Sequence, residues 1–200
     1  MIEILIPTCK PDVTELEAAI RKYSPGAAII ASCRSGSAAY NRNWCLGHAV
    51  DELAIMIDDD ISGFYPGWHW DLFAPLVDPQ VAIVTARLMR PDGRVGPTCS
   101  RCYDLSPETI DIEPDEHCVL PTAAIAFRNI GIRFDENFRG SGFEDGDWCF
   151  EYRKRWPTCR FVQSNKCRLV HRNEMKAQRE NWNHNKAYFE SKWKQQPICR

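Results

Sequence analysis

The sequence contains no stretch of about twenty apolar residues, the length that a helix needs to cross a bilayer. Its first residues lack a basic leader, a long apolar run and a small-residue cleavage site, so no secretion signal is expected. No internal repeat, low-complexity tract or linker interrupts the chain. Together with 44% hydrophobic and 26% charged residues, these absences predict one cytoplasmic globular domain over residues 1–200, with no membrane span.

The sequence also lacks the two matched cysteine pairs of most structural zinc sites. Its ten cysteines are scattered through segments with apolar periodicity, and we expect them to be reduced and half buried. Cys99 and Cys102 alone have metal-ligand spacing, with His117 and Cys118 as the nearest further ligands. A structural zinc at Cys99 and Cys102 therefore stays an open alternative.

Acidic and basic residues are segregated along the chain. Residues 151–200 hold 13 Lys and Arg against 4 Asp and Glu, whereas residues 1–150 hold 12 against 23. The acidic part favours a metal site, and the basic part favours phosphate groups on a donor or an anionic acceptor. The alternative for the basic part is a helix whose charges only meet solvent.

Short apolar runs alternate with helical patterns in the first third of the chain, which is typical of a parallel α/β unit. Strands are expected at 2–6, 27–32, 53–57, 81–89, 119–127, 160–163 and 168–171. Helices are expected at 12–23, 38–50, 68–77, 144–156 and 176–194. Asp12 or Thr14 is placed to cap the first helix. Residues 90–116, rich in Pro, Asp, Gly and Cys, are expected to form loops that shape an acceptor pocket.

Three consecutive aspartates, Asp58, Asp59 and Asp60, directly follow the expected strand 53–57. Acidic residues at the carboxyl end of a buried strand lie where open α/β sheets bind ligands. The three carboxylates would repel one another unless solvent or a cation shared their charge, and carboxylate oxygens suit Mg²⁺ or Mn²⁺. Strand alternation predicts Asp58 and Asp60 on one side and Asp59 on the other. The alternative is an acidic loop that caps the next helix.

A second acidic cluster, Glu144, Asp145 and Asp147, lies among glycines at the start of an expected helix. The helix dipole favours acids there, but three acids are more than capping requires. A carboxylate that faces the metal site across a cleft would instead take a proton from an acceptor hydroxyl. His171 closes an expected strand and is either a structural histidine or, as a neutral imidazole, a ligand for Mn²⁺.

The order of these motifs resembles the family 2 glycosyltransferases of the GT-A fold. The matching segments are residues 4–8, 36–43, 57–60 and 142–147, and the similarity extends from residue 2 to about residue 171. Residues 185–193 are also similar to the ends of some bacterial and phage members. The resemblance implies a single α/β domain of the GT-A, Rossmann-like type, with a mixed, mainly parallel central sheet flanked by helices.

The resemblance also implies a role for each matching residue. It implies contacts to a nucleotide-sugar donor from Pro7, Thr8, Arg42, Asn43, Asp58 and Asp59. It implies a Mn²⁺ or Mg²⁺ ion bound by Asp60, Asp58 and His171. It implies that Asp145 is the catalytic base and that Glu144 binds acceptor or donor hydroxyls. UDP is the expected donor carrier, because it is the commonest in the family.

The implied reaction is a metal-dependent, inverting transfer of a sugar to an acceptor hydroxyl. Residues 1–90 would form the nucleotide-sugar and metal half, residues 91–175 the acceptor and catalytic half, and residues 176–200 a C-terminal basic helix. The acceptor is left open between a glycan and a hydroxylated base in DNA, which the basic and aromatic tail would contact. Two rival functions remain, a nucleotidyltransferase and a non-catalytic nucleic-acid-binding module. A nucleotidyltransferase usually has a Gly-rich, basic loop after its first strand, and residues 8–12 match such a loop poorly.

Overall fold

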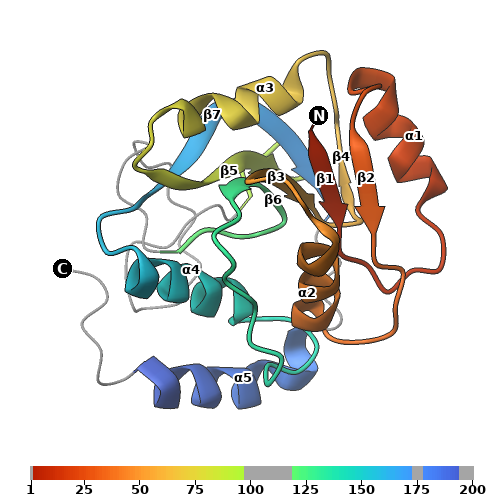
Figure 1. Cartoon of the computed structure of the whole chain (residues 1–200). Coiled ribbons are helices and arrows are strands. Elements are labelled where there is room, and N and C mark those ends of the chain that lie inside the picture. The colour runs from red at the N-terminus through yellow and green to blue at the C-terminus, as the bar shows by residue number, and fades with distance from the viewer. Residues whose placement is uncertain (1, 97–118, 173–177, 194–200) are drawn as a thin grey trace.

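The computed structural model describes residues 2–96, 119–172 and 178–193, and Figure 1 shows their arrangement. Within these ranges seven strands form one sheet in the order β2-β1-β3-β6-β5-β7-β4. The strands are β1 (Glu3–Ile6), β2 (Ala28–Ala31), β3 (Leu53–Ile57), β4 (Ile61–Ser62), β5 (Val81–Met89), β6 (Ala124–Arg128) and β7 (Arg160–His171). The helices are α1 (Thr14–Tyr23), α2 (Ala38–His48), α3 (Trp68–Phe73), the 3-10 helix η1 (Ala74–Val77), α4 (Glu144–Arg155) and α5 (Gln178–Trp193).

Five strands of the sheet point the same way, and β6 and β4 run opposite to them. β1 pairs in parallel with β2 and β3, and β5 pairs in parallel with β7. β6 joins β3 to β5 through antiparallel ladders on both sides. The carboxyl ends of β1, β3 and β7 therefore meet the start of β6 at one edge of the sheet. The expected α/β fold with a mixed, mainly parallel sheet flanked by helices is confirmed.

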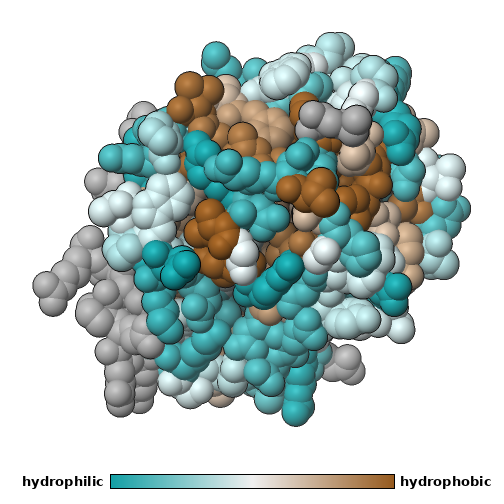
Figure 2. Space-filling view, in the orientation of Figure 1, coloured by the Kyte–Doolittle hydropathy of each residue, from teal (hydrophilic) through white to brown (hydrophobic). Residues whose placement is uncertain are grey.

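Helices cover both faces of the sheet, because successive side chains of a strand point to opposite faces. Ile4 packs in the cluster that contains residues of α1 and α3, whereas Leu5 packs with residues of α2 and α4. Helix α5 forms a further layer outside α4, where Phe189 and Trp193 pack against Phe150. Figure 1 shows α5 beneath α4, and Figure 2 shows that this part of the surface is mainly hydrophilic.

Four expected elements differ from the observed ones. The strands expected at 160–163 and 168–171 form one strand, β7, because both parts pair with β5 and a register shift between Ala86 and Arg87 accommodates the residues between them. The helix expected at 68–77 divides into α3 and η1, where Pro75 cannot continue the α-helical hydrogen bonds. The strand expected at 119–127 is β6, which begins later, at Ala124.

Two smaller expectations concern the first helix and the cysteines. Neither Asp12 nor Thr14 is the capping residue of α1, because that position is Val13 and carries no side-chain cap, although the Asp12 carboxylate accepts a hydrogen bond from the backbone N–H of Thr14 at 2.8 Å. In the described part of the chain the cysteines are free thiols, and four of them are buried: Cys45, Cys149, Cys159 and Cys167. The zinc alternative at Cys99, Cys102, His117 and Cys118, and most of the expected acceptor loops, lie outside the described residues. No described helix has the length and apolar character needed to cross a bilayer.

Candidate functional site

A cluster of Asp58, Asp60 and His171 lies at the edge of the sheet where β3 ends. One ligand atom of each side chain lies within 4.8 Å of the others, and His171 Nε2 is 3.2 Å from Asp60 Oδ1. The sheet brings His171 there, because it is the last residue of β7 and pairs with Ile61 of the short strand β4. The resemblance grouped these three residues, and the fold places their side chains together. We call them the three-residue cluster.

The chemistry of the three-residue cluster fits a divalent cation. Burial raises the pKa of Asp58, and the neighbouring carboxylates of Asp145 and Asp60 raise it further, while Arg42 opposes them. Burial lowers the pKa of His171, but the close contact with the Asp60 carboxylate and the charges of the surrounding carboxylates outweigh burial, so the net shift is upward. Two close carboxylates and an imidazole are suitable ligands for Mn²⁺ or Mg²⁺. The charge of such an ion would offset the repulsion between the carboxylates of Asp58 and Asp60.

Asp59 points away from the three-residue cluster, as the alternation predicted, but the cause is a turn that follows β3 instead of a continued strand. Its carboxylate pairs with Lys10 Nζ at 2.8 Å and accepts a short hydrogen bond from the Thr8 hydroxyl. The backbone N–H of Thr8 donates to Ser32 Oγ at 2.8 Å. Asp59 and Thr8 therefore connect the loop after β1 to the aspartate turn, and the neighbouring Pro7 is buried.

Arg42 of α2 connects the two acidic motifs. Its Nη1 lies 2.7 Å from Glu144 Oε1 and 3.0 Å from Asp145 Oδ1, and its Nη2 lies 3.4 Å from Asp58 Oδ1. Arg42 is 5% exposed, and its guanidinium lies over the ring of Phe134 at 5.3 Å from the centroid. The planar fork of arginine suits such convergent contacts. The structure thus places Arg42 among the carboxylates of the site, and not on an open donor surface.

Glu144 and Asn43 are also occupied within the protein. Glu144 is 3% exposed, and its carboxylate accepts hydrogen bonds from Arg42 and from the backbone N–H of Gly142. Burial raises the pKa of Glu144 and the charge of Asp145 adds to the rise, whereas Arg42 opposes it. Asn43 donates to the backbone oxygen of Phe134 at 2.8 Å and accepts from its N–H at 2.8 Å. Direct contact with a substrate is therefore a poor fit for Glu144, Asn43 and Arg42.

Asp145 is the carboxylate of the second motif that stays accessible, with 29% of its side chain exposed. It is held by Thr122, whose hydroxyl donates to Oδ1 and whose backbone N–H donates to Oδ2 at 3.2 Å. The next residue, Ala123, accepts a 2.7 Å hydrogen bond from the backbone N–H of Asp58. One short segment therefore supports both acidic motifs. No sequence motif marks Thr122, although an antiparallel strand beside β3 must begin at the edge where β3 ends.

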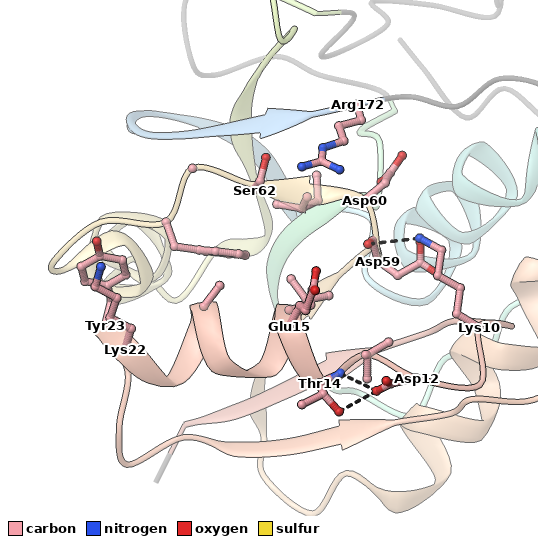
Figure 3. A pocket seen from close by; sticks show the side chains of 16 residues that line it. Lys10, Asp12, Thr14, Glu15, Lys22, Tyr23, Asp59, Asp60, Ser62 and Arg172 are labelled. Carbon is pink, nitrogen blue, oxygen red and sulfur yellow. Dashed lines mark hydrogen bonds and ion pairs between the residues drawn. The ribbon is translucent and has the colours of Figure 1, made fainter.

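A groove of about 570 Å³ runs beside the aspartate turn, between α1 and β4. Lys10, Asp59, Asp60 and Arg172 line one end of it, and Figure 3 shows the guanidinium of Arg172 above β4, between Ser62 and Asp60. The backbone N–H of Arg172 donates to the carbonyl oxygen of Asp60 at 3.3 Å. No carboxylate of the described residues forms an ion pair with the Arg172 guanidinium. The groove thus adjoins the three-residue cluster and offers it a cationic side chain that sequence analysis did not single out.

Of the two lysines in the described part of the basic tail, Lys192 is bound to protein carboxylates. Lys192 Nζ lies 2.7 Å from Asp147 Oδ1 and 2.9 Å from Asp135 Oδ2, and Lys186 pairs with Glu190 one turn along α5. Burial acts to lower the pKa of Lys192, but these carboxylates outweigh burial and raise it. Lys192 is therefore not available to a phosphate backbone, whereas Lys186 is half exposed and its pair with Glu190 spans 3.8 Å.

No protein-family model and no curated protein sequence matches the chain. Similar solved structures include glucosyl-3-phosphoglycerate synthase from Mycobacterium tuberculosis in complex with Mn²⁺, UDP-glucose and phosphoglyceric acid, with 16% identity over 94% of this chain and 77% of that chain and a TM-score of 0.60. A second is a fragment of S. aureus TarS, with 14% identity over 92% and 62% and a TM-score of 0.56. A third is GalNAc-T7 with UDP, GalNAc and Mn²⁺, with 10% identity over 100% and 53% and a TM-score of 0.57. Identities this low show the fold alone. The chain therefore has the GT-A fold of nucleotide-diphospho-sugar transferases, as the order of its motifs predicted.

Proposed function

We propose that the chain is a metal-dependent glycosyltransferase that uses a nucleotide-diphosphate sugar. The observation that carries the proposal is the three-residue cluster beside the accessible carboxylate of Asp145, at the edge of the sheet where this class of fold binds ligands. Solved structures of similar fold contain UDP with Mg²⁺ or with Mn²⁺. We accordingly expect a donor whose nucleotide is UDP.

In this proposal Asp58, Asp60 and His171 hold the metal. Bound there, Mn²⁺ or Mg²⁺ supplies positive charge that offsets the charge developing on the leaving diphosphate. Lys10 and Arg172 lie at the adjoining end of the groove, where their charges would pair with phosphate oxygens.

Pro7, Thr8 and Asp59 stay proposed donor contacts at the end of β1 and in the aspartate turn. Arg42 and Asn43 act on the site through other protein groups. Residues 1–90 would thus supply most of the donor site. His171 would contribute to this site from residues 91–175, the half that also carries the proposed base.

Asp145 is the proposed base. Thr122 and Arg42 fix the orientation of its carboxylate, and the exposed part faces solvent. Asp145 would take the proton of an acceptor hydroxyl while that oxygen attacks the anomeric carbon. The bond between this carbon and the diphosphate oxygen breaks on the opposite side, and its electron pair leaves with the diphosphate. Inversion at the sugar is expected, and NMR of the freshly formed product would identify the anomer.

The acceptor is either a glycan or a hydroxylated base in DNA, and the arrangement of α5 favours the glycan. Lys192 already has carboxylate partners, so among the described side chains of α5 only the half-exposed Lys186 is a lysine that a phosphate backbone could reach. Labelled DNA should therefore show no salt-sensitive shift with the protein. A shift that disappears as salt rises would favour the DNA acceptor.

Asp60→Ala is expected to abolish the metal-dependent stabilisation of the protein by nucleotide. With Mn²⁺ and UDP at about 100 times the dissociation constant, the native chain should gain about 2.7 kcal/mol of stability, seen as a raised Tm. Removal of the Asp60 carboxylate should eliminate this gain, since a carboxylate of the proposed metal site is lost. Thermal shift with a panel of nucleoside diphosphates, with and without Mn²⁺, measures it. Asp92→Asn, at an exposed position far along the chain, is the control.

The same measurement, extended to nucleoside triphosphates and to nucleic acid, separates the rival functions. A response to one diphosphate that needs Mn²⁺ and Asp60 supports a transferase and names its base. Stabilisation by nucleoside triphosphates alone, with release of pyrophosphate on turnover, would replace the proposal by a nucleotidyltransferase. No response to any nucleotide, together with binding of nucleic acid, would replace it by a binding module.

Arg172→Gln is expected to weaken UDP binding in Mn²⁺ by about 10- to 100-fold, because a charge-assisted hydrogen bond to phosphate contributes about 1.5–3 kcal/mol. The loss should shrink at high salt, where screening weakens the attraction in the native chain. Isothermal titration at two salt concentrations measures both effects. Arg94→Gln is the matched control, because Arg94 is 80% exposed and does not line the groove. Equal affinities for the native chain and Arg172→Gln would remove Arg172 from the donor site.

A further inference from the structure

The loop before Glu144 has an unusual backbone. Gly140 has φ 58°, Gly142 has φ 110° and Phe143 has φ 72°, so left-handed conformations recur over residues 140–143. Such a conformation costs energy at a bulky side chain such as Phe143 and persists only where surrounding groups hold it. We call residues 139–143 the entry loop of α4. The neighbouring contacts show which group holds it.

Asn185 of α5 makes a dense set of contacts with the entry loop. Its side chain is 0% exposed. Oδ1 accepts a hydrogen bond from the backbone N–H of Arg139 at 2.9 Å, and Nδ2 donates to the backbone oxygen of Arg139 at 2.8 Å and of Gly142 at 3.0 Å. A longer contact from Nδ2 reaches the oxygen of Ser141 at 3.4 Å. One side chain thus satisfies backbone groups at both ends of the loop.

The contacts require a primary amide of this length. An amide carries an acceptor and two donors, and all of these functions are used here. Aspartate would keep the acceptor but place a negative charge against the carbonyl oxygens of the entry loop. Leucine would keep much of the volume and lose every hydrogen bond. Buried backbone groups left without partners cost free energy, so either change should release the loop.

The entry loop leads directly to Glu144 and Asp145. The backbone N–H of Gly142 donates to Glu144, and Glu144 in turn lies 2.7 Å from Arg42, which also contacts Asp145. The same loop touches the start of α2, because the backbone N–H of Ala38 donates to the oxygen of Gly140 at 2.8 Å. A displaced entry loop would therefore change how Glu144 meets Arg42.

Helix α5 has other anchors besides Asn185. Trp193 Nε1 donates to Asp147 Oδ1 at 2.8 Å, and Lys192 lies 2.7 Å from the same oxygen. Phe189 lies against Gly146, where an added Cβ would be 3.3 Å from its ring. A change at Asn185 should therefore leave α5 docked on α4. A substitution at Asn185 can therefore change the entry loop without detaching α5 from α4.

We propose that Asn185 is a positioning residue. From α5 it holds the entry loop in the conformation that presents Glu144 to Arg42, and through Arg42 it fixes the carboxylate of Asp145. Its effect on turnover rests on the glycosyltransferase function proposed above, whereas its effect on the loop does not. Helix α5 is in this sense part of the site without contacting substrate.

The test compares Asn185→Leu with two controls on the same helix. Asn183→Leu changes an exposed position, and Trp193→Phe removes an anchor of α5 far from the entry loop. In Asn185→Leu the backbone amides of residues 139–145 should exchange with deuterium about tenfold faster. Release of UDP from UDP-glucose, UDP-galactose or UDP-N-acetylglucosamine should fall about 100-fold in kcat, because small displacements of catalytic groups cost this much. UDP affinity in Mn²⁺ should stay within about twofold of the native value.

Each outcome decides the proposal. Unchanged exchange over residues 139–145 in Asn185→Leu would overturn it, even if activity were lost. An equal fall of kcat in Trp193→Phe at the same Tm would assign the effect to general docking of α5 and would also overturn it. A native chain that releases no UDP from any of the sugars would contradict the proposed function, and the exchange data would still decide whether Asn185 holds the loop.

Discussion

Asp145→Asn is expected to lower the release of UDP from a UDP-sugar by about 10²–10⁴-fold while leaving UDP binding in Mn²⁺ unchanged. An asparagine oxygen in the place of Oδ1 can still accept hydrogen bonds from the Thr122 hydroxyl and from Arg42, and only the longer 3.2 Å bond from the Thr122 backbone N–H to Oδ2 is lost, so the local fold should persist. The amide nitrogen cannot take a proton from water or from an acceptor hydroxyl. Turnover and binding should therefore separate in this variant.

The measurement combines steady-state kinetics of UDP release with isothermal titration of UDP in Mn²⁺. Asp92→Asn is the matched control, because Asp92 is 53% exposed and contacts only its own turn. A variant that kept full turnover would remove Asp145 as the base. A variant that lost UDP binding as well would instead place Asp145 in the donor site, beside the three-residue cluster.

Arg42→Met is expected to destabilise the protein by about 3–5 kcal/mol at neutral pH, which is the typical cost of removing one partner of a buried ion pair. Methionine retains much of the apolar stem of arginine but leaves Glu144 buried without its cation. Arg42→Lys should lose less, because the charge remains although the fork is lost. Equilibrium unfolding in urea measures the free energy of unfolding of each variant.

The penalty of Arg42→Met should depend on pH with a definite sign. In the native chain burial is the largest cause that raises the pKa of Glu144, and Arg42 opposes it, so removing Arg42 should raise this pKa further. A carboxyl group whose folded pKa exceeds its unfolded value stabilises the folded state at low pH, and this stability is lost as pH rises through the folded pKa. The difference between Arg42→Met and the native chain should thus be larger at about pH 8 than at about pH 5.

Arg94→Met serves as the control for this series, since its exposed side chain should change stability by less than about 0.5 kcal/mol at either pH. A penalty that stayed constant between the two pH values would mean that Glu144 does not carry it. A penalty below about 1 kcal/mol would mean that Arg42 does not neutralise a buried charge at all.

Much of the fold follows from local patterns along the chain. The strands at the start of the sheet are short apolar runs, and their alternation divides Ile4 and Leu5 between the two faces. The acidic turn at Asp58–Asp60 follows its strand directly, so its place at the carboxyl edge could be predicted. The single strand β7 could not, because the register shift within it depends on pairing with β5 and has no local signal.

The candidate site divides in the same way. The sequence by itself determined which residue types follow which strand or precede which helix, and the resemblance of this order to a family then named Asp60, Asp145 and His171. Only the tertiary structure decided that Arg42 and Glu144 form an ion pair with each other, because their contact joins positions 102 residues apart. Thr122 and Asn185 belong to the site for the same reason. Their hydrogen bonds depend on which backbone and side-chain groups the packed sheet and helices bring within about 3 Å, and no local pattern encodes that distance.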